Sequence, residues 1–380
     1  MSPDKIPQID LREQHRVLRD ELLAAVGAVF DGAQFILGPP VGALEQRVAA
    51  RMGCAHGVGL NSGTDAIVLA LAALDVGPGD EVITTPFTFV STVEMIVEIG
   101  ARAVLVDVEP DTLNIDPAAV ARAVSARTKV IMPVHLYGQS ADLTRLAALA
   151  AERGLAVVED AAQAIGAAHH GRPVGSWGRA SCLSFFPTKN LGGCGDAGML
   201  VTPEAALADR VRMLRSHGQR EKYRYLVRGR NSRLDTLQAA ILLAKLEHLD
   251  RWNEARRAHA RRYGELLAGL PLALPVERPE NRHVYHQYTI RVRRRDEVRR
   301  LLSEAGIGTA VHYPIPLHLQ PAWKGLGYGE GDLPVAEQAA REVLSLPLYP
   351  ELTPAGVERV AAALAEVTRS LGLEGEGAPA

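Results

Sequence analysis

Two short apolar runs, each followed at once by polar residues, constrain the fold of this chain more than any other feature of its sequence. The runs cover residues 155–158 and 180–186, and their length is typical of buried strands in an α/β sheet. Asp160 follows the first run, and Lys189 follows the second in a loop rich in glycine. Because ligands of open α/β sheets bind at the carboxyl ends of the strands, we expect Asp160 and Lys189 to face one crevice.

Strand-like and helix-like patterns alternate over most of the chain. Predicted helices at 10–30 and 41–52 precede a strand at 56–60, a helix at 65–74 and a strand at 81–85. This alternation predicts an α/β fold with a mostly parallel central sheet, helices on both faces and right-handed crossovers. A smaller C-terminal α/β lobe is expected beside it.

The chain divides into two predicted domains and a tail. Residues 1–250 form a large domain with the N-terminal helices, and residues 251–371 form a linker helix and a small domain. Residues 372–380 have the composition of a disordered tail. Within the small domain, HVYHQYTIRVRRR at 283–295 predicts one amphipathic strand, and its basic run at 291–295 predicts an exposed strand end.

The charge balance argues against binding of nucleic acid. The 380 residues include 42 basic and 44 acidic side chains. Between residues 210 and 233 there are nine Lys or Arg and one acid, Glu221. A solvated helix face is the default explanation for this stretch, and a nucleotide diphosphate fits it better than nucleic acid does.

Other features of the sequence predict a cytoplasmic protein. The three cysteines form no CxxC pair, and the N-terminal residues contain no apolar segment typical of a secretory signal. Every apolar run is broken well before the roughly 20 residues that span a bilayer, so no membrane contact is expected. The pattern of potential ligands predicts no metal site.

A lysine and a carboxylate aimed at one crevice are the pair that pyridoxal phosphate chemistry needs. The lysine holds the aldehyde, and the carboxylate keeps the ring nitrogen protonated so that the ring acts as an electron sink. Only roughly one in 2,500 unperturbed lysines is neutral at pH 7. Burial beside Phe185 and Phe186 would supply the neutral amine for Lys189. Taken singly, Lys189 could be a solvated residue and Asp160 a helix N-cap.

Residues 61–64, Asn-Ser-Gly-Thr, form a turn between a strand and a helix. The N–H groups at such a helix start predict an anion site, although an N-cap by Ser62 or Thr64 explains the same residues. GVGLNSG lacks the GxGxxG order, so binding of a dinucleotide is not indicated. Phe87 and Phe89 lie in the turn after residue 85, where one ring could cover a flat ligand or both could belong to the core.

VVEDAAQAIGA at 157–167 and SFFPTKNLGGCGDAG at 184–198 resemble the cofactor segments of the DegT/DnrJ/EryC1/StrS family of sugar aminotransferases, which use pyridoxal phosphate. The similarity extends from QIDL at 8–11 to LPLYP at 346–350. The resemblance implies the fold of aspartate aminotransferase, known as PLP fold type I. It also implies the following roles: Lys189 as the lysine that holds the cofactor, Asp160 as partner of the ring nitrogen, Gln163 beside the ring hydroxyl, Phe89 over the ring, and Ser62, Gly63, Thr64 and Ser184 around the phosphate.

GRNSRLDTLQAAIL at 229–242 resembles the family segment that crosses to a neighbouring subunit. By that resemblance Asn231 binds the cofactor phosphate of the partner chain, so the active sites are shared across a homodimer. Arg233 lies near the same site and offers a fork for a carboxylate or a phosphate. His312 and Tyr313 lie in a proline-stiffened loop that the resemblance places over the sugar.

The resemblance implies transfer of an amino group from glutamate, which leaves as 2-oxoglutarate, to a nucleotide-linked keto-sugar, for cell-surface polysaccharide (O-antigen) or amino-sugar biosynthesis. RSHGQ, NSRLDTLQAAIL and AVHYPIPLHLQPA are most similar to the branch that acts on 3-keto sugars. Within it, UDP-2-acetamido-3-keto-glucuronate is favoured, since Arg233 and His312 could meet a uronate carboxylate. Alternatives are a dTDP-linked 3-keto-6-deoxy sugar, a 4-keto sugar or keto-cyclitol, and a non-enzymatic sensor of nucleotide sugars.

Overall fold

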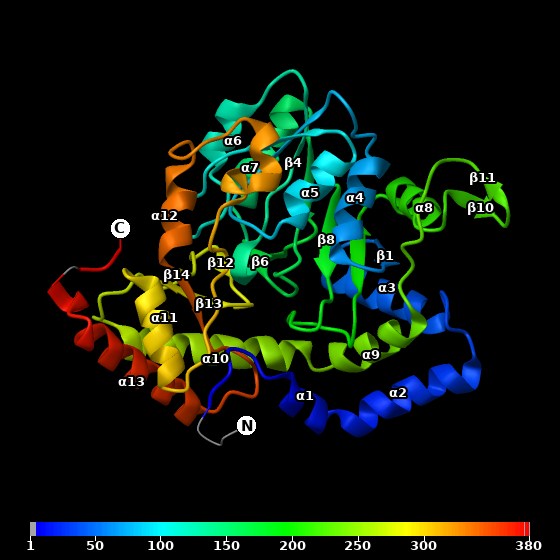
Figure 1. Ribbon diagram of the computed structural model, residues 1–380. Coiled ribbons are helices and arrows are strands. Elements are labelled where there is room, and N and C mark those ends of the chain that lie inside the picture. The colour runs from blue at the N-terminus through cyan, green and yellow to red at the C-terminus, as the bar shows by residue number, and fades with distance from the viewer. Residues whose placement is uncertain (1–4, 376, 380) are drawn as a thin grey trace.

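A seven-stranded sheet forms the centre of the large domain in the computed structural model, which describes residues 5–375 and 377–379 (Figure 1). The strands are arranged in the order β1 (His56–Leu60), β9 (Gly198–Thr202), β8 (Ala180–Ser184), β5 (Ala156–Asp160), β4 (Thr128–Ile131), β2 (Glu81–Thr84) and β3 (Arg102–Leu105). Only β9 runs antiparallel to its two neighbours, and every other neighbouring pair is parallel. The predicted α/β fold with a mostly parallel sheet is confirmed.

Helices cover both faces of this sheet. On one face lie α4 (Gly63–Ala73), α5 (Ser91–Glu98) and α8 (Ala205–Leu214). On the other lie α3 (Pro39–Arg51), α6 (Pro117–Ala123), α7 (Leu143–Arg153) and α9 (Thr236–Leu246). Successive strand residues serve opposite faces, as Val157 and Val158 show by belonging to different clusters.

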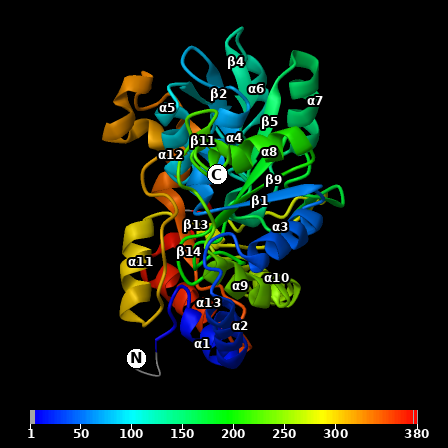
Figure 2. The same cartoon turned by 90° about the vertical axis from the view of Figure 1, so that its right-hand side faces the viewer.

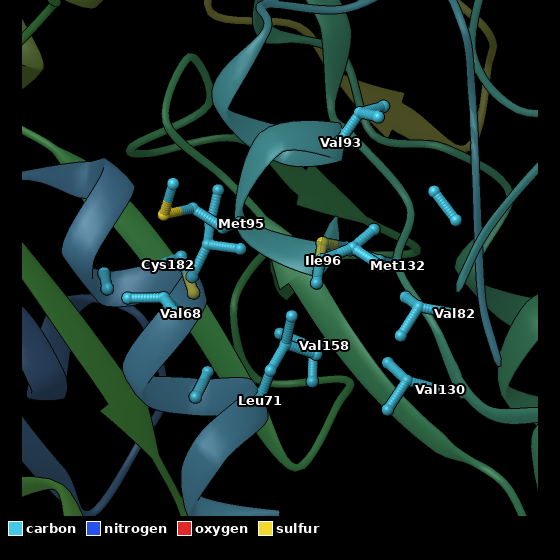
Figure 3. Close-up of a cluster of buried hydrophobic side chains, with 14 of the residues drawn as sticks. Val68, Leu71, Val82, Val93, Met95, Ile96, Val130, Met132, Val158 and Cys182 are labelled. Atoms are coloured by element: carbon cyan, nitrogen blue, oxygen red, sulfur yellow. The ribbon is translucent and has the colours of Figure 1, made fainter. Parts of the chain in front are cut away.

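Figure 3 shows the cluster on the α4 and α5 face. Val68 and Leu71 of α4 and Ile96 of α5 point onto Val158 of β5, and all four side chains are at most 2% exposed. Burial of each such side chain stabilises the fold by roughly 1.5–3 kcal/mol. Because Val158 lies two residues before Asp160 in β5, this packing supports the strand that carries Asp160.

The predicted N-terminal helix at 10–30 is wrong as a single element. The structure has α1 (Leu11–Val17) and α2 (Arg19–Gly32), because the chain leaves helical dihedral angles at Leu18, where φ is −96° and ψ is 7°. The Leu18 side chain is 5% exposed, whereas α1 buries none of its residues. Large apolar side chains on and after these helices are exposed: Val17, Leu23, Phe30, Phe35, Ile36 and Leu37.

The C-terminal part of the chain has its own hydrophobic cluster. It forms between α10 (Leu249–Leu267), the antiparallel pair β13 (Tyr288–Arg291) and β14 (Val343–Leu346), α11 (Arg295–Glu304) and α13 (Pro354–Ser370). Figure 2 shows α11 and α13 beside the two-stranded pair, and α12 (Pro334–Glu342) leads directly into β14. Within the predicted tail, Leu373 is buried, and residues 376 and 380 lie outside the described residues.

The prediction of an exposed strand end at 291–295 is wrong in part: Arg293 and Arg294 are exposed, but Arg291 and Arg295 are not. β13 ends at Arg291 and α11 begins at Arg295, and both side chains are buried. Arg291 pairs with Glu342 at 2.8 Å, and Arg295 donates to the carbonyl oxygens of Ala340 and Val343. The aliphatic parts of these arginines cover apolar surface, and their guanidinium groups find acceptors near the end of α12 and the start of β14. A local charge pattern does not reveal such partners.

The described residues contain neither a candidate membrane-spanning helix nor a candidate metal site. Within residues 5–375 and 377–379 we find no helix that is long and apolar enough to cross a bilayer. The same residues contain no cluster of three or more His, Cys, Asp or Glu side chains that could hold a metal ion.

Candidate active site

A cavity of about 460 Å³ opens at the carboxyl ends of β1, β5 and β8. The helix start of α4, the turn before α5, the β8–β9 loop and two loops of the C-terminal part form its walls. Ten of the residues predicted from the sequence line it: Ser62, Gly63, Thr64, Phe89, Asp160, Gln163, Ser184, Lys189, His312 and Tyr313. Thus segments from residue 62 to residue 313 meet at one place, as the crossover topology requires.

Lys189 lies in the loop that follows β8. Its backbone N–H donates to the carbonyl oxygen of Phe186 at 2.8 Å, which turns the chain so that the side chain enters the cavity. Burial lowers the pKa of Lys189 to about 8, although the nearby Asp160 carboxylate acts in the opposite direction. At pH 7 about one in ten such amines is neutral, roughly 200 times the fraction of an ordinary lysine. Lys189 is therefore suited to act as a nucleophile and as a base.

The reactivity of this amine is expected to follow its lowered pKa. When pyridoxal phosphate is added to cofactor-free protein, the rate at which the yellow adduct forms should rise with pH and level off above about pH 8. A rate that keeps rising to about pH 10.4, the range of free lysine, would contradict the assignment. Stopped-flow absorbance gives this profile, with N-acetyl-lysine as the control.

Asp160 is the last residue of β5, and its side chain is 5% exposed. Oδ2 accepts a hydrogen bond from Thr92 Oγ1 at 2.8 Å, and Oδ1 accepts one from the N–H of Ala162 at 3.2 Å. No helix begins here, so the N-cap alternative for Asp160 is wrong. A carboxylate offers about four acceptor positions, so Asp160 retains capacity for a further donor in the cavity.

Gln163 connects the large domain to the C-terminal part across the cavity. Its Oε1 accepts from the N–H of Tyr137 at 2.7 Å, and its Nε2 lies 3.3 Å from the hydroxyl of Tyr313. The hydroxyl of Tyr137 donates in turn to the carbonyl oxygen of His312. The loop that carries His312 and Tyr313 is thereby held over the cavity and limits the access of water to it.

The start of α4 forms a corner suited to an anion. Ser62 is the N-cap, and its Oγ accepts from the N–H of Asp65 at 3.1 Å, so the predicted cap is present at Ser62. Ser184 of β8 lies opposite: a Cβ on Gly63 would come within 2.8 Å of its Cβ. A Cβ on Gly198 would come within 2.2 Å of the Ser62 carbonyl carbon. Glycine is thus required for the close approach that puts a hydroxyl, a helix N-terminus and its N–H groups together.

The two phenylalanines of the turn before α5 have different surroundings. Phe89 lines the cavity with 54% of its surface exposed, whereas Phe87 is fully buried in the core. The ring centroids of Phe89 and Tyr313 are 6.5 Å apart. An exposed ring at the cavity mouth can cover a flat ligand, and this site therefore fits a planar cofactor that carries a phosphate at one end and a basic ring nitrogen at the other.

Several lining residues were missed in the sequence, among them His286 and Gln287. The predicted strand at 283–295 begins only at Tyr288, so residues 283–287 form a loop that reaches the cavity. Burial, together with Lys189, Arg256 and His312, holds the pKa of His286 well below its usual range. His283, Tyr285 and His286 do not alternate as in a half-buried strand. This irregular spacing is the feature of the sequence that indicates a loop here.

Asn231 and Arg233 do not line the cavity of their own chain. They lie between β11 (Arg224–Tyr225) and α9, where Asn231 is exposed and Arg233 is half-buried. Among the described residues, Arg233 Nε has no hydrogen-bond partner. A role for the two residues in the site of a partner subunit remains a prediction.

Comparisons with known proteins agree with this geometry. Residues 17–365 match the model of the DegT/DnrJ/EryC1/StrS aminotransferase family. The chain is 51% identical to a pleiotropic regulatory protein of Geobacillus stearothermophilus, over 96% of this chain and 99% of that one. It is 48% identical to the UDP-N-acetyl-3-dehydro-α-D-glucosamine 3-aminotransferase of Acidithiobacillus ferrooxidans, over 94% and 96% of the two chains. It is 43% identical to the UDP-2-acetamido-2-deoxy-3-oxo-D-glucuronate aminotransferase of Pseudomonas aeruginosa, over 94% and 98%.

One solved structure has nearly the same backbone fold. DesV of S. venezuelae superposes with a TM-score of 0.94 at 45% identity, over 96% of this chain and 98% of that one. Agreement at this level extends to the arrangement of the elements that form the cavity.

Proposed function

The chain belongs to the DegT/DnrJ/EryC1/StrS aminotransferase family, and we propose that it transfers an amino group from glutamate to the keto carbon of a UDP-linked 3-keto hexose. It is a sugar aminotransferase that uses pyridoxal phosphate. The observation that carries the proposal is the meeting of the Lys189 amine, with its pKa lowered to about 8, and the buried Asp160 carboxylate in one cavity.

The lining residues fit the cofactor. Lys189 would hold its aldehyde, Asp160 its ring nitrogen, and Phe89 would cover the ring. The phosphate would lie at Ser62, Gly63, Thr64 and Ser184, and Gln163 would lie near the ring hydroxyl. When bound, pyridoxal phosphate supplies an electron sink that allows an amino group to be exchanged for a carbonyl.

The residues of the chain provide acid–base chemistry and a closed site. Neutral Lys189 Nζ accepts a proton from the amino acid donor and later returns it to the carbon that receives the amine. The Asp160 carboxylate accepts hydrogen bonds from Thr92 Oγ1 and from the N–H of Ala162, which fix its orientation. Tyr313 and His312 shield these steps from water, because their loop is tied to Gln163 and Tyr137.

The charges around the cavity support a sugar without a carboxylate. Of the lining residues that the structure describes, Lys189 is the only lysine, and none is an arginine. Burial lowers the pKa of His312 to about 4, with a further contribution from Lys189, so His312 is uncharged at pH 7. Apart from Lys189, which would hold the cofactor, the described lining residues of one chain therefore offer no cation to a uronate. A UDP-linked 2-acetamido-3-keto-glucose, as named for the relative from A. ferrooxidans, fits it better.

A second candidate substrate is the corresponding uronate, which the sequence favours. The observation on its side is Arg233, whose buried Nε lacks a hydrogen-bond partner among the described residues and which could reach the site of a partner subunit. Exposed apolar side chains on α1 and α2, including Val17, Leu23 and Phe30, support the homodimer that this arrangement needs.

A panel of UDP- and dTDP-linked keto-sugars, each assayed with glutamate, tests the proposed function. We expect the neutral UDP-linked 3-keto sugar to show the highest kcat/KM. One 2-oxoglutarate should be released for each amino-sugar formed. A holoenzyme whose yellow absorbance glutamate leaves unchanged would instead indicate a sensor of nucleotide sugars.

The substitution Arg233→Ala separates the two candidate substrates. If Arg233 pairs with a uronate, the variant should lose on the order of 10-fold or more in kcat/KM for the uronate, since it removes a charge-assisted hydrogen bond. The value for the neutral sugar should change much less. Arg228→Ala, an exposed arginine of the same segment, is the matched control. Equal losses on both sugars would rule out a contact with the carboxylate.

A further inference from the structure

The Asp160 carboxylate receives a hydrogen bond from a residue that does not itself line the cavity. Thr92, in the first turn of α5, is fully buried, and its Oγ1 lies 2.8 Å from Asp160 Oδ2. Thr88 Oγ1, also buried, lies 3.1 Å from Thr92 Oγ1. The three polar groups form a row that leads from the turn before α5 to the end of β5.

The direction of the donors in this row follows from chemistry. An ionised carboxylate only accepts, so the single proton of the Thr92 hydroxyl must point to Asp160. The Thr92 oxygen is then free to accept from Thr88. Chains of this kind strengthen each hydrogen bond by polarisation, and those that end on a charge are stronger than neutral ones.

The hydrogen bond from Thr92 to Asp160 lies in buried surroundings. The same helix turn directs Val93, Met95 and Ile96 into the apolar cluster of Figure 3, where Cys182 also lies. Burial, with Asp160 and Glu159 nearby, raises the pKa of the Cys182 thiol. Within the described residues, Thr92 Oγ1 and Ala162 N are the hydrogen-bond donors to the Asp160 carboxylate. Loss of the Thr92 hydroxyl, which is fully buried, would remove one of these donors.

We propose that Thr92 is a positioning residue for cofactor binding: its hydroxyl, oriented by Thr88, holds the Asp160 carboxylate turned toward the ring nitrogen of the cofactor. This inference rests on the proposed role of Asp160. Thr92 lies outside the cavity lining, and of the groups it contacts only Asp160 is placed at the ring nitrogen, so an effect selective for that nitrogen passes through Asp160.

The test compares two cofactors that differ only at the ring nitrogen. Pyridoxal phosphate and its 1-deaza analogue, in which C–H replaces the nitrogen, are titrated into cofactor-free protein, and dissociation constants are measured by equilibrium dialysis. Thr92→Val keeps the shape of the side chain and removes the hydroxyl. It should weaken binding of pyridoxal phosphate by on the order of 10-fold and leave binding of the deaza analogue nearly unchanged. Thr92→Ser, which keeps the hydroxyl, should bind both compounds as the wild type does.

The possible outcomes distinguish the proposed role of Thr92 from the proposed role of Asp160. Equal weakening of both compounds in Thr92→Val would mean that the residue only supports the fold, and no weakening of either would likewise overturn the proposal. If the wild type shows no preference that depends on the ring nitrogen, or if Asp160→Asn keeps the preference of the wild type, the role of Asp160 itself fails. Thermal unfolding of the cofactor-free variants checks the fold. If Thr92→Val does not fold, Thr88→Val is compared instead; because Thr88 itself lines the cavity, the ratio of the two dissociation constants is the readout, and a smaller selective loss is expected.

Discussion

Replacing Lys189 by alanine is expected to abolish transamination while cofactor binding persists. The variant removes the one cavity amine whose pKa burial lowers to about 8, and with it both the group that holds the aldehyde and the base that moves the proton. Loss of these two roles should lower kcat by a factor on the order of 10⁴ or more. The anion corner at Gly63 and Ser184 and the ring of Phe89 are untouched, so they still retain the cofactor.

Single-turnover assays with glutamate, together with dialysis against added cofactor, measure the two effects separately. Lys324→Ala, at an exposed lysine, is the control and should behave as the wild type. Lys189→Arg keeps a positive charge but has no neutral amine near pH 7, so it should be as inactive as the alanine variant. Substantial turnover in either Lys189 variant would refute the proposed mechanism.

Asp160→Asn is the second substitution for which we expect a very large effect. The side chain keeps its shape, but a neutral amide cannot stabilise a protonated ring nitrogen in this buried setting, where the carboxylate is only 5% exposed. We expect kcat to fall by a factor on the order of 10³ and the affinity for pyridoxal phosphate to fall with it. In addition, the amide NH₂ group would face Thr92 Oγ1 or Ala162 N–H, which now donate to the carboxylate.

Steady-state kinetics and cofactor titration of the purified variant test this expectation. Asp209→Asn, an exposed acid on α8, serves as the matched control and should leave both quantities unchanged. A variant at Asp160 with full affinity and near-normal kcat would show that this carboxylate does not serve the ring nitrogen, even though it lies in the cavity.

The contacts between remote segments escaped prediction for a common reason. Leu18 interrupts the N-terminal helix, and His286 enters the cavity from a loop. Arg291 is buried against Glu342, and Arg295 is buried against the carbonyl oxygen of Ala340. For the two arginines and for His286, a partner far along the chain contributes to the position of the side chain. A local pattern of charge or hydrophobicity contains no information about that partner.

The amino-acid sequence by itself determined the α/β class, the family and the residues at the two strand ends. Apolar runs that stop at Asp160 and before Lys189 specify strand ends locally, and parallel crossovers bring such ends to one edge of a sheet. Only the tertiary structure decided what surrounds them: burial that lowers the pKa of Lys189 to about 8, and the hydroxyl of Thr92 that donates to Asp160 from 68 positions away. Desolvation and hydrogen bonding depend on distances in space, which follow from the packing of the whole chain.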